Sequence, residues 1–383
     1  MTSVAPLSAS PRATYPAAEA TPTHPGAIRP VLLTSLRDLQ WRIRRFVLAA
    51  VATGFVLALA LMMSGISNSF SVEVHNTIAA LGAQTWLVRA GSPGPFTDPV
   101  PLPLRTVAEA SRLPGVRRAA PLLVSRAIET TPGASASSDK NVNVLGIEPG
   151  RLGSPAVVQG QGLGGGDEIV ADESLHLAVG STVALNGTTF RVVGLTNGIT
   201  YFAGQPVVFM GLGALNRMDG SSPPVATAVL LDGVPTRTLP GFTALTDSQV
   251  RTDLGRPVAQ ASKTIKLIEV LLWIVAAAII AAIIYLSALE RRADFAVMKA
   301  VGTPSWHLFV GLVVQAALLA CVAAAIGFLV EAAVAPTSSM AVRLSGADYA
   351  AVPVLAVLVG IVASFLPARR AARVDPALAF GAG

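Results

Sequence analysis

One short glycine-rich stretch in this chain has a spacing that could bind phosphate. Gly160 to Gly165 satisfies G-x-G-x-x-G, a pattern in which glycines let a strand-to-helix turn approach a pyrophosphate closely. That use requires a helix directly after the turn, whereas Gly166 and Asp167 lead into a strand-like pattern. The stretch is therefore predicted to be a flexible turn. The chain also lacks a G-x-x-x-x-G-K-[ST] loop, so it cannot grip ATP phosphates in that way.

Metal and acid–base chemistry have little support in the sequence. No ligand spacing surrounds any of the four histidines, His24, His75, His176 and His307. A possible carboxylate cluster flanks a predicted strand in an exposed loop and is expected to be solvated: Asp167, Glu168, Asp172 and Glu173. The single cysteine, Cys321, excludes a disulfide within one chain. We therefore predict no metal site, no catalytic residues and no enzymatic activity.

Two polar residues are conspicuous because they lie inside long apolar runs. They are Glu269 and Gln315. An ionisable group within a membrane is a functional candidate. Glu269, however, lies close enough to the outer end of its run for the carboxylate to reach the membrane surface.

The composition and the apolar runs indicate a membrane protein with one sizeable soluble domain. The chain has 383 residues, of which 52% are hydrophobic and 13% charged, and its mean hydropathy is +0.61. Its excess of basic residues forms no patch typical of nucleic-acid binding. Four runs are long enough to cross a hydrocarbon core of about 30 Å. These predicted spans are residues 46–66, 267–289, 308–330 and 349–366.

The arginines orient these spans. They cluster before the first span, after the second and after the fourth, and the positive-inside rule places all three clusters in the cytoplasm. Residues 1–30 read as a disordered cytoplasmic tail, and residues 31–45 as an amphipathic helix at the membrane interface, with Trp41, Arg44 and Arg45 as anchors. Residues 367–383 form a second cytoplasmic tail, so both termini are predicted to be cytoplasmic in a multi-pass protein of the plasma membrane.

The segment at 67–266, between the first and second spans, is predicted to be an extracytoplasmic α+β domain carried on two stalk helices. One stalk continues the first span, and the other should begin after Pro257. Asn186-Gly187 between two alternating runs is a strong hairpin signal. We expect a helix near Leu104–Leu113 and strands at residues 85–89, 120–129, 141–147, 168–171, 182–185, 189–193, 206–210 and 225–231. The fold class is therefore an α-helical membrane protein with four transmembrane helices and an inserted α+β domain. Small residues four apart in the second span, such as Ala278 and Ala282, favour close helix packing.

The loop between the second and third spans has its own helical pattern. Within residues 290–304, one mostly apolar face follows the i, i+3, i+4, i+7 spacing: Asp294, Val297, Met298 and Val301. Gly302 then ends the helix, and Thr303-Pro304 starts the next one. Arg291 and Arg292 are expected to anchor this helix to lipid headgroups. The alternative is an ordinary short basic loop, which the pattern alone does not exclude.

These motifs together resemble a known family. The stretch Leu289–Pro304, the small-residue span that reaches Glu331 and the closing run Pro367–Pro376 resemble the carboxy-terminal half of ABC transporter permeases of the MacB, LolC and FtsX type. The phrase Val179–Gly194 and the long segment between spans one and two are similar to the same family. Among members, the chain most resembles actinobacterial permeases labelled as glutamine-transport components.

The resemblance implies a mechanism called mechanotransmission. In this mechanism the helix at residues 290–304 is a cytoplasmic coupling helix. A separate ATPase, which binds ATP and Mg²⁺, docks under it at Asp294, Val297, Met298 and Val301. Its closure moves the stalk helices and the outer domain, and thereby exports or extracts a substrate at the outer face of the membrane. The resemblance also implies pairing with a second permease copy, most simply as a homodimer, and contact with membrane lipids. The alternative is an FtsX-like regulator whose outer domain activates a cell-wall hydrolase without moving a substrate.

Overall fold

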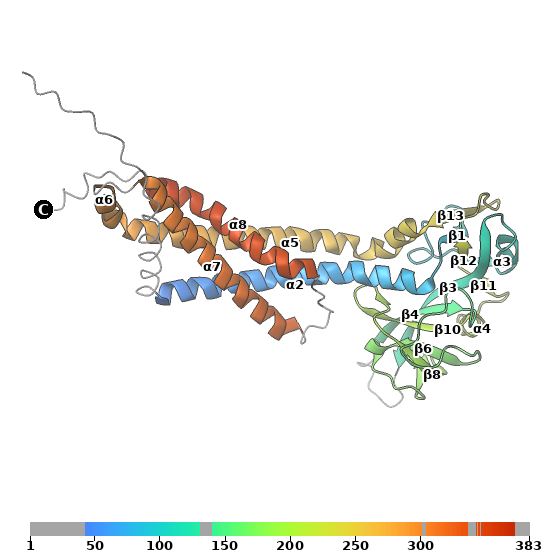
Figure 1. Ribbon diagram of the computed structural model, residues 1–383. Coiled ribbons are helices and arrows are strands. Elements are labelled where there is room, and N and C mark those ends of the chain that lie inside the picture. The colour runs from blue at the N-terminus through green and yellow to red at the C-terminus, as the bar shows by residue number, and fades with distance from the viewer. Residues whose placement is uncertain are drawn as a thin grey trace, which may run out of the picture.

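The protein is an elongated molecule with a helical part at one end and a mixed α/β domain at the other (Figure 1). The computed structural model describes residues 43–130, 140–300, 304–335 and 346–371, together with Val342 and Leu344. Residues 1–30 therefore lie outside the described residues, as does most of the predicted interfacial helix, including Trp41.

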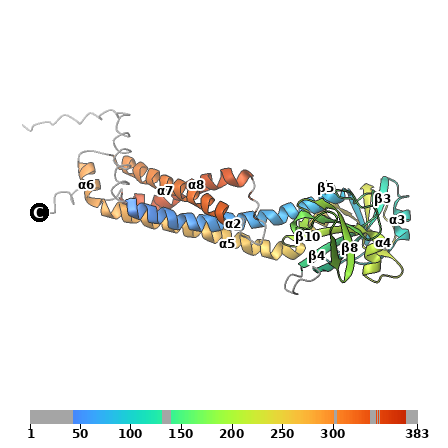
Figure 2. The same cartoon turned by 90° about the horizontal axis from the view of Figure 1, so that it is seen from below.

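Two long helices join the two ends and lie side by side in both views (Figures 1 and 2). They are α2 (Ile43–Leu81) and α5 (Asp247–Glu290), of 39 and 44 residues. At 1.5 Å per residue, α5 is about 66 Å long, which is roughly twice the thickness of a hydrocarbon core. Both helices therefore continue well beyond the predicted spans as stalks.

The start of α5 differs from the expectation that the helix would begin after Pro257. The helix begins at Asp247 and carries Pro257 inside it. A capping box holds its first turn: Thr246 Oγ1 accepts from the Gln249 amide, and the Gln249 side chain accepts from the Thr246 amide. The next turn is buried at Val250 and Leu254, so packing offsets the hydrogen bond that the proline removes.

The remaining helices are α6 (Arg292–Ala300), α7 (Ser305–Val334) and α8 (Gly346–Ala371). By length and composition, α2, α5 and α7 can each cross a membrane, whereas α8 contains a shorter apolar stretch at Val352–Ala363. Each of the four predicted spans falls within a helix. Among the described residues, however, only three of these helices have the length and hydropathy expected of a membrane span. The fourth crossing stays a prediction.

Small residues bring the helices together, although not at the pair named from the sequence. A Cβ placed on Gly54 of α2 would lie 2.7 Å from Ile326 Cγ2 and 3.1 Å from the Ala323 carbonyl oxygen of α7. Ala278 and Ala282, by contrast, are exposed on α5. The face of α5 that packs against the other helices lies elsewhere around the helix axis and carries Ala276, Ile280, Ile284 and Ala288. Ala278 and Ala282 therefore do not pack against the other helices of the same chain, and whether they pack against a second copy stays a prediction.

The α/β domain, called the outer domain below, is built on an 11-stranded mixed sheet. Nine strands follow the path β13-β1-β12-β3-β4-β10-β6-β8-β5, while β7 pairs with β3 and β8, and β9 pairs with β10. Most neighbours are antiparallel, whereas β10 pairs with β4 and β6 with β8 in parallel. Two short helices pack on it, α3 (Arg105–Ala110) and α4 (Leu212–Met218), and η3 (Glu173–Leu175) follows β6. The strands are β1 (Thr85–Arg89), β2 (Leu102–Pro103), β3 (Val116–Thr130), β4 (Lys140–Ile147), β5 (Gln159–Gly160), β6 (Glu168–Asp172), β7 (Thr182–Leu185), β8 (Thr188–Thr196), β9 (Thr200–Tyr201), β10 (Gln205–Gly211), β11 (Val225–Ala226), β12 (Ala228–Gly233) and β13 (Phe242–Thr246).

Most strand predictions are confirmed, with two kinds of difference. The hairpin forms as expected between β7 and β8, because Asn186 (φ 48°) and Gly187 (φ 79°) both adopt the left-handed conformation that its tight turn requires. The predicted strand at 225–231 is split at Thr227, whose side chain accepts a hydrogen bond from the Val124 amide. The elements that were not predicted are the strands β2, β5, β9 and β13 and the helices α4 and η3.

Candidate functional site

The glycine-rich stretch 160–165 is a turn and opens no helix. It runs from β5 into β6, and Gly165 has a φ of 121°. The Gly164 amide donates to Glu168 Oε2 at 3.0 Å, and Arg191 donates to the other carboxylate oxygen at 2.8 Å. These two contacts lower the pKa of Glu168, the Arg191 guanidinium contributing most. The Gly164 amide is thus directed to a carboxylate of the chain itself, and the stretch leads into β6 without a helix, which supports the prediction of a turn.

The four carboxylates around β6 do not form a common site, and one of them is not solvated as expected. Asp172 is buried and caps η3, and its second oxygen accepts from the Ile199 amide at 2.8 Å. It therefore fixes the loop after β8. No group of three or more His, Cys, Asp or Glu residues that could hold a metal occurs among the residues that the structure describes.

Gln315 bridges two of the membrane helices. Its side-chain amide on α7 donates to Ser287 Oγ on α5 at 3.3 Å. Glu269 on α5 is half-buried. Both positions are consistent with roles in the helix bundle, and neither opens onto a described cavity.

The predicted coupling helix corresponds to α6, at the end of the molecule farthest from the outer domain (Figure 1). Asp294 and Val297 are exposed, Val297 at 52%. Met298 is only half-exposed because it packs against the helix bundle. Ala293 and Ala300 complete the exposed face, whereas Val301 lies outside the described residues. The solvent-exposed face of α6 is therefore rotated about the helix axis relative to the predicted docking face, and Met298 lies at its edge.

The opposite face of α6 is fixed to the bundle by two fully buried residues. Phe295 and Ala296 are 2% and 0% exposed. The Arg291 guanidinium lies 5.4 Å from the centre of the Phe295 ring, and Arg291 is itself 9% exposed. Arg291 is thus directed into the protein, and the expectation that it anchors lipid headgroups is wrong for this subunit; nothing is described of the Arg292 side chain. Among the predicted anchors on α2, Arg44 is exposed, while Arg45 forms an ion pair with Glu290 at the end of α5.

A second candidate site lies at the other end of α5, where the helix meets the outer domain. Asp253 is fully buried within α5. One of its carboxylate oxygens accepts from the Phe96 amide at 3.0 Å, and the other accepts from the Thr97 hydroxyl. Since a buried carboxylate that accepts several hydrogen bonds holds its donors firmly, α5 is fastened to loop 94–97 of the outer domain.

The α2 stalk is fastened to a different loop, at residues 198–204. Asn76 donates to the Gly198 carbonyl at 3.3 Å, and Thr77 donates to the Thr200 carbonyl at 3.1 Å. The buried Glu73 carboxylate accepts from the Gly204 amide at 3.2 Å. Each stalk thus has its own point of attachment to the domain.

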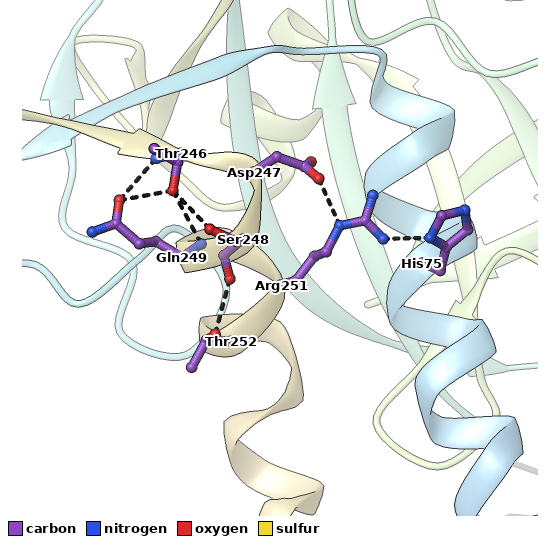
Figure 3. Close-up of polar contacts among 7 residues, drawn as sticks. All are labelled: His75, Thr246, Asp247, Ser248, Gln249, Arg251 and Thr252. Carbon is purple, nitrogen blue, oxygen red and sulfur yellow. Dashed lines mark hydrogen bonds and ion pairs between the residues drawn. The ribbon is translucent and has the colours of Figure 1, made fainter.

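The two stalks also contact each other directly at the level of these attachments (Figure 3). Arg251 on α5 donates to Asp247 at 2.6 Å, one turn earlier on the same helix. The same guanidinium donates to Nδ1 of His75 on α2 at 2.5 Å. A shift of one stalk along the other would therefore break a specific polar contact.

A row of aromatic rings links the two attachment loops. Phe96, in the loop held by α5, contacts Trp86 at 5.8 Å and Tyr201 at 5.7 Å between ring centres. Tyr201 in turn contacts Phe202 edge-to-face at 4.7 Å, in the loop held by α2. Burial raises the pKa of the Tyr201 phenol well above its usual value, so the ring stays neutral.

Sequence reasoning missed this junction, although a signal was present. Glu73 and Asp253 are acidic residues placed among the apolar positions that form the inward stripe of each stalk. A charge on a buried helix face requires partners. That argument could have marked both residues, but not the loops that supply the donors.

Comparison with known proteins gives consistent results over nearly the whole chain. A family described as MacB-like periplasmic core domain matches residues 46–259, and one described as FtsX-like permease C-terminal matches residues 267–376. An uncharacterized ABC transporter permease of Mycobacterium bovis is 35% identical over 92% of this chain and 99% of the relative. One of Mycobacterium tuberculosis is 36% identical over the same shares. The crystal structure of the periplasmic region of MacB from Actinobacillus actinomycetemcomitans is similar with a TM-score of 0.34 and 12% identity, over 47% of this chain and 96% of that one. The names of these relatives specify no glutamine substrate, so the glutamine label stays a prediction.

Proposed function

Because the chain belongs to the ABC transporter permeases that combine a MacB-like periplasmic core domain with an FtsX-like C-terminal region, we propose that it couples ATP hydrolysis in a separate ATPase chain to motion of its outer domain. The proposed motion exports or extracts a substrate at the outer face of the membrane. ATP and Mg²⁺ would be bound by the partner, since this sequence has no phosphate-binding loop of the P-loop kind.

The observation that carries the proposal is the exposed face of α6. A short helix whose one side is fixed by Phe295 and Ala296 presents Val297 to solvent, beside Asp294. Burying the exposed half of Val297 against a partner would stabilise the complex by about 1 kcal/mol, roughly half the value for a fully exposed valine. We therefore assign the docking face to Ala293, Asp294, Val297 and Ala300.

The helices supply a mechanical connection from this face to the outer domain. α5 runs without interruption from its attachment at Asp253 to Glu290, and α6 begins two residues later. Ala288, Phe295 and Leu308 belong to one buried cluster, so α6 cannot move far without moving the ends of α5 and α7. A push on α6 would reach loop 94–97 through a single rigid helix.

We place α6 and both termini in the cytoplasm of a cell bounded by its plasma membrane, and the α/β domain outside. The arginine clusters and the family of the outer domain support this orientation. Labelling from outside should reach a cysteine that replaces Ser137 and miss one that replaces Thr303. The reverse pattern would refute the orientation.

We also propose that two copies pair in the membrane through α5. In the 18-residue apolar stretch of α5, only 17% of the residues are buried within one subunit, whereas 44% are buried in the corresponding stretches of α2 and α7. Its outward face carries Leu267, Leu271 and Ile274 together with the small residues Ala278 and Ala282. Small residues let a partner helix approach closely in lipid, which favours a second copy there over lipid alone.

The docking proposal is tested by Val297→Asp. A charge placed in the groove of the ATPase should weaken docking by about 100-fold or more, whereas membrane insertion should be unchanged. The measurement is co-purification of the ATPase and stimulation of its hydrolysis. Val234→Asp is the matched control, because Val234 is 69% exposed and directly follows β12 of the outer domain.

Met298→Asp and Ala296→Asp are unsuitable for this test, since both residues contact the bundle and a charge there would disturb the permease itself. If Val297→Asp retained and stimulated the ATPase like the wild type, α6 would not be the docking face. The isolated permease should hydrolyse no ATP.

A further inference from the structure

A cavity of about 360 Å³ lies between the outer domain and the α5 stalk. It is lined by Arg126, Asn141, Val142, Phe202, Gln205 and Pro257. The volume is within the range of small-molecule sites. From its chemistry and its walls, we propose that the cavity is a ligand site for an organic anion with an apolar or aromatic part, and that movement of the stalks changes its shape.

The cation that would recognise the ligand is Arg126, in the middle of β3. Its guanidinium carbon lies over the Phe202 ring, 5.0 Å from the ring centre, so the cation contacts an aromatic face. Within the described part of the chain, no carboxylate lies within ion-pair distance of Arg126. The guanidinium therefore keeps donors free for a carboxylate, sulfonate or phosphate.

Two side-chain amides add hydrogen-bond donors beside this cation. Asn141 comes from β4, and Gln205 begins β10. Gln205 Oε1 already accepts from the buried Asn143 amide at 3.3 Å, so the amide nitrogen of Gln205 is the group left for a ligand. The remaining walls, Val142, Pro257 and the Phe202 ring, are apolar. One cationic and two amide groups beside an apolar wall fit an amphiphilic anion better than an inorganic ion.

Two walls of the cavity are connected to different stalks. Phe202 and Gln205 lie in and directly after the loop that Asn76, Thr77 and Glu73 fasten to α2. Pro257 lies on α5, one turn after the attachment at Asp253. Any displacement of α2 relative to α5 therefore moves one wall against the other. This role as a substrate site rests on the proposed function, but binding itself can be tested on the permease alone.

The experiment uses the full chain in phosphatidylcholine nanodiscs with two fluorescent probes. Dansylglycine joins a carboxylate to an aromatic ring, and dansylamide is its uncharged counterpart. The wild type should bind dansylglycine at least about ten-fold more tightly than dansylamide, as expected for one charge-assisted contact. Arg126→Gln should abolish this preference, and Phe202→Leu should weaken both probes. Arg112→Gln, an exposed arginine on the far side of the domain after α3, should change neither.

Two further arms locate the source of the ligand and the link to motion. Phosphatidylglycerol in the discs would compete with dansylglycine if the site takes a membrane amphiphile, whereas N-acetylglycine alone would compete if it takes a water-borne anion; either result supports the anion site. Adding the ATPase with a non-hydrolysable ATP analogue should shift the dissociation constant for dansylglycine.

Equal binding by wild type and Arg126→Gln, or no saturable binding, would overturn the proposal. That failure leaves ATPase docking at Val297 untouched, so the two proposals fail separately.

Discussion

Asp253 shows how much one buried carboxylate can determine. It is fully buried in α5 and accepts from Phe96 and Thr97, whereas Asp247 on the same helix pairs with Arg251 at the surface. Both are aspartates six residues apart with hydrogen-bonded partners. They differ in whether water can replace those partners.

We expect Asp253→Asn to lower the free energy of unfolding by about 1.5–3 kcal/mol, because a neutral amide replaces the carboxylate and the hydrogen bonds from Phe96 and Thr97 lose their charge assistance. Asp247→Asn should cost no more than about 1 kcal/mol, since its side chain is 41% exposed. Thermal unfolding of the full chain in detergent measures both. Similar losses in the two variants would mean that the Asp253 contacts are not a firm attachment.

The acidic residues also show where sequence reasoning stops. The apolar pattern identified β1 and the β7–β8 hairpin from local spacing alone. It could not identify β13, whose partner β1 lies more than 150 residues earlier in the chain. The attachment sites share this difficulty, because Asp253 and Phe96 meet only once the domain has folded. For α6, the spacing located the helix, but its rotation depends on packing of Phe295 against the bundle.

At the scale of elements, the contact between α2 and α7 depends on the absence of a side chain at Gly54. An added Cβ would meet Ile326 Cγ2 at 2.7 Å and Ile326 Cβ at 2.8 Å. On α5, a Cβ added to Gly255 would meet only Val74 Cγ2, at 3.8 Å. The two helical glycines therefore predict opposite responses to the same substitution.

Gly255→Ala should stabilise the protein by about 0.5–1 kcal/mol, because alanine favours the helix and fits the space. Gly54→Ala should destabilise it despite the same gain in helix propensity, because α2 and α7 would have to separate. Thermal unfolding midpoints in one detergent give the comparison. A stabilised Gly54→Ala variant would show that the two helices are not closely packed at this point.

At the scale of the whole molecule, pairing of two copies can be read from cross-links. In a Cys321→Ala background, which has no other cysteine, Ile274→Cys on the outward face of α5 should form a disulfide-linked dimer in membranes. Leu329→Cys is the control, since Leu329 is 71% exposed but lies on α7. Cross-linking at Leu329 without cross-linking at Ile274 would place the partner on a different face.

The proposed mechanism requires the two stalks to move relative to each other where they meet the outer domain. The ideal Cβ position at Gly255 lies 3.8 Å from Val74 Cγ2, so Val74→Cys with Gly255→Cys brings two sulfurs close to the geometry of a disulfide. The bond would join α2 to α5 beside the contact of Arg251 with His75, without touching the docking face on α6.

With Cys321 replaced by alanine, we expect the oxidised double variant to retain the ATPase but to lose most of its ATP turnover, and a reductant to restore it. Each single-cysteine variant, treated in the same way, controls for oxidation. Equal turnover in the locked and the reduced protein would show that hydrolysis proceeds without stalk motion at this level, and the path from α6 to the outer domain would then have to be sought elsewhere.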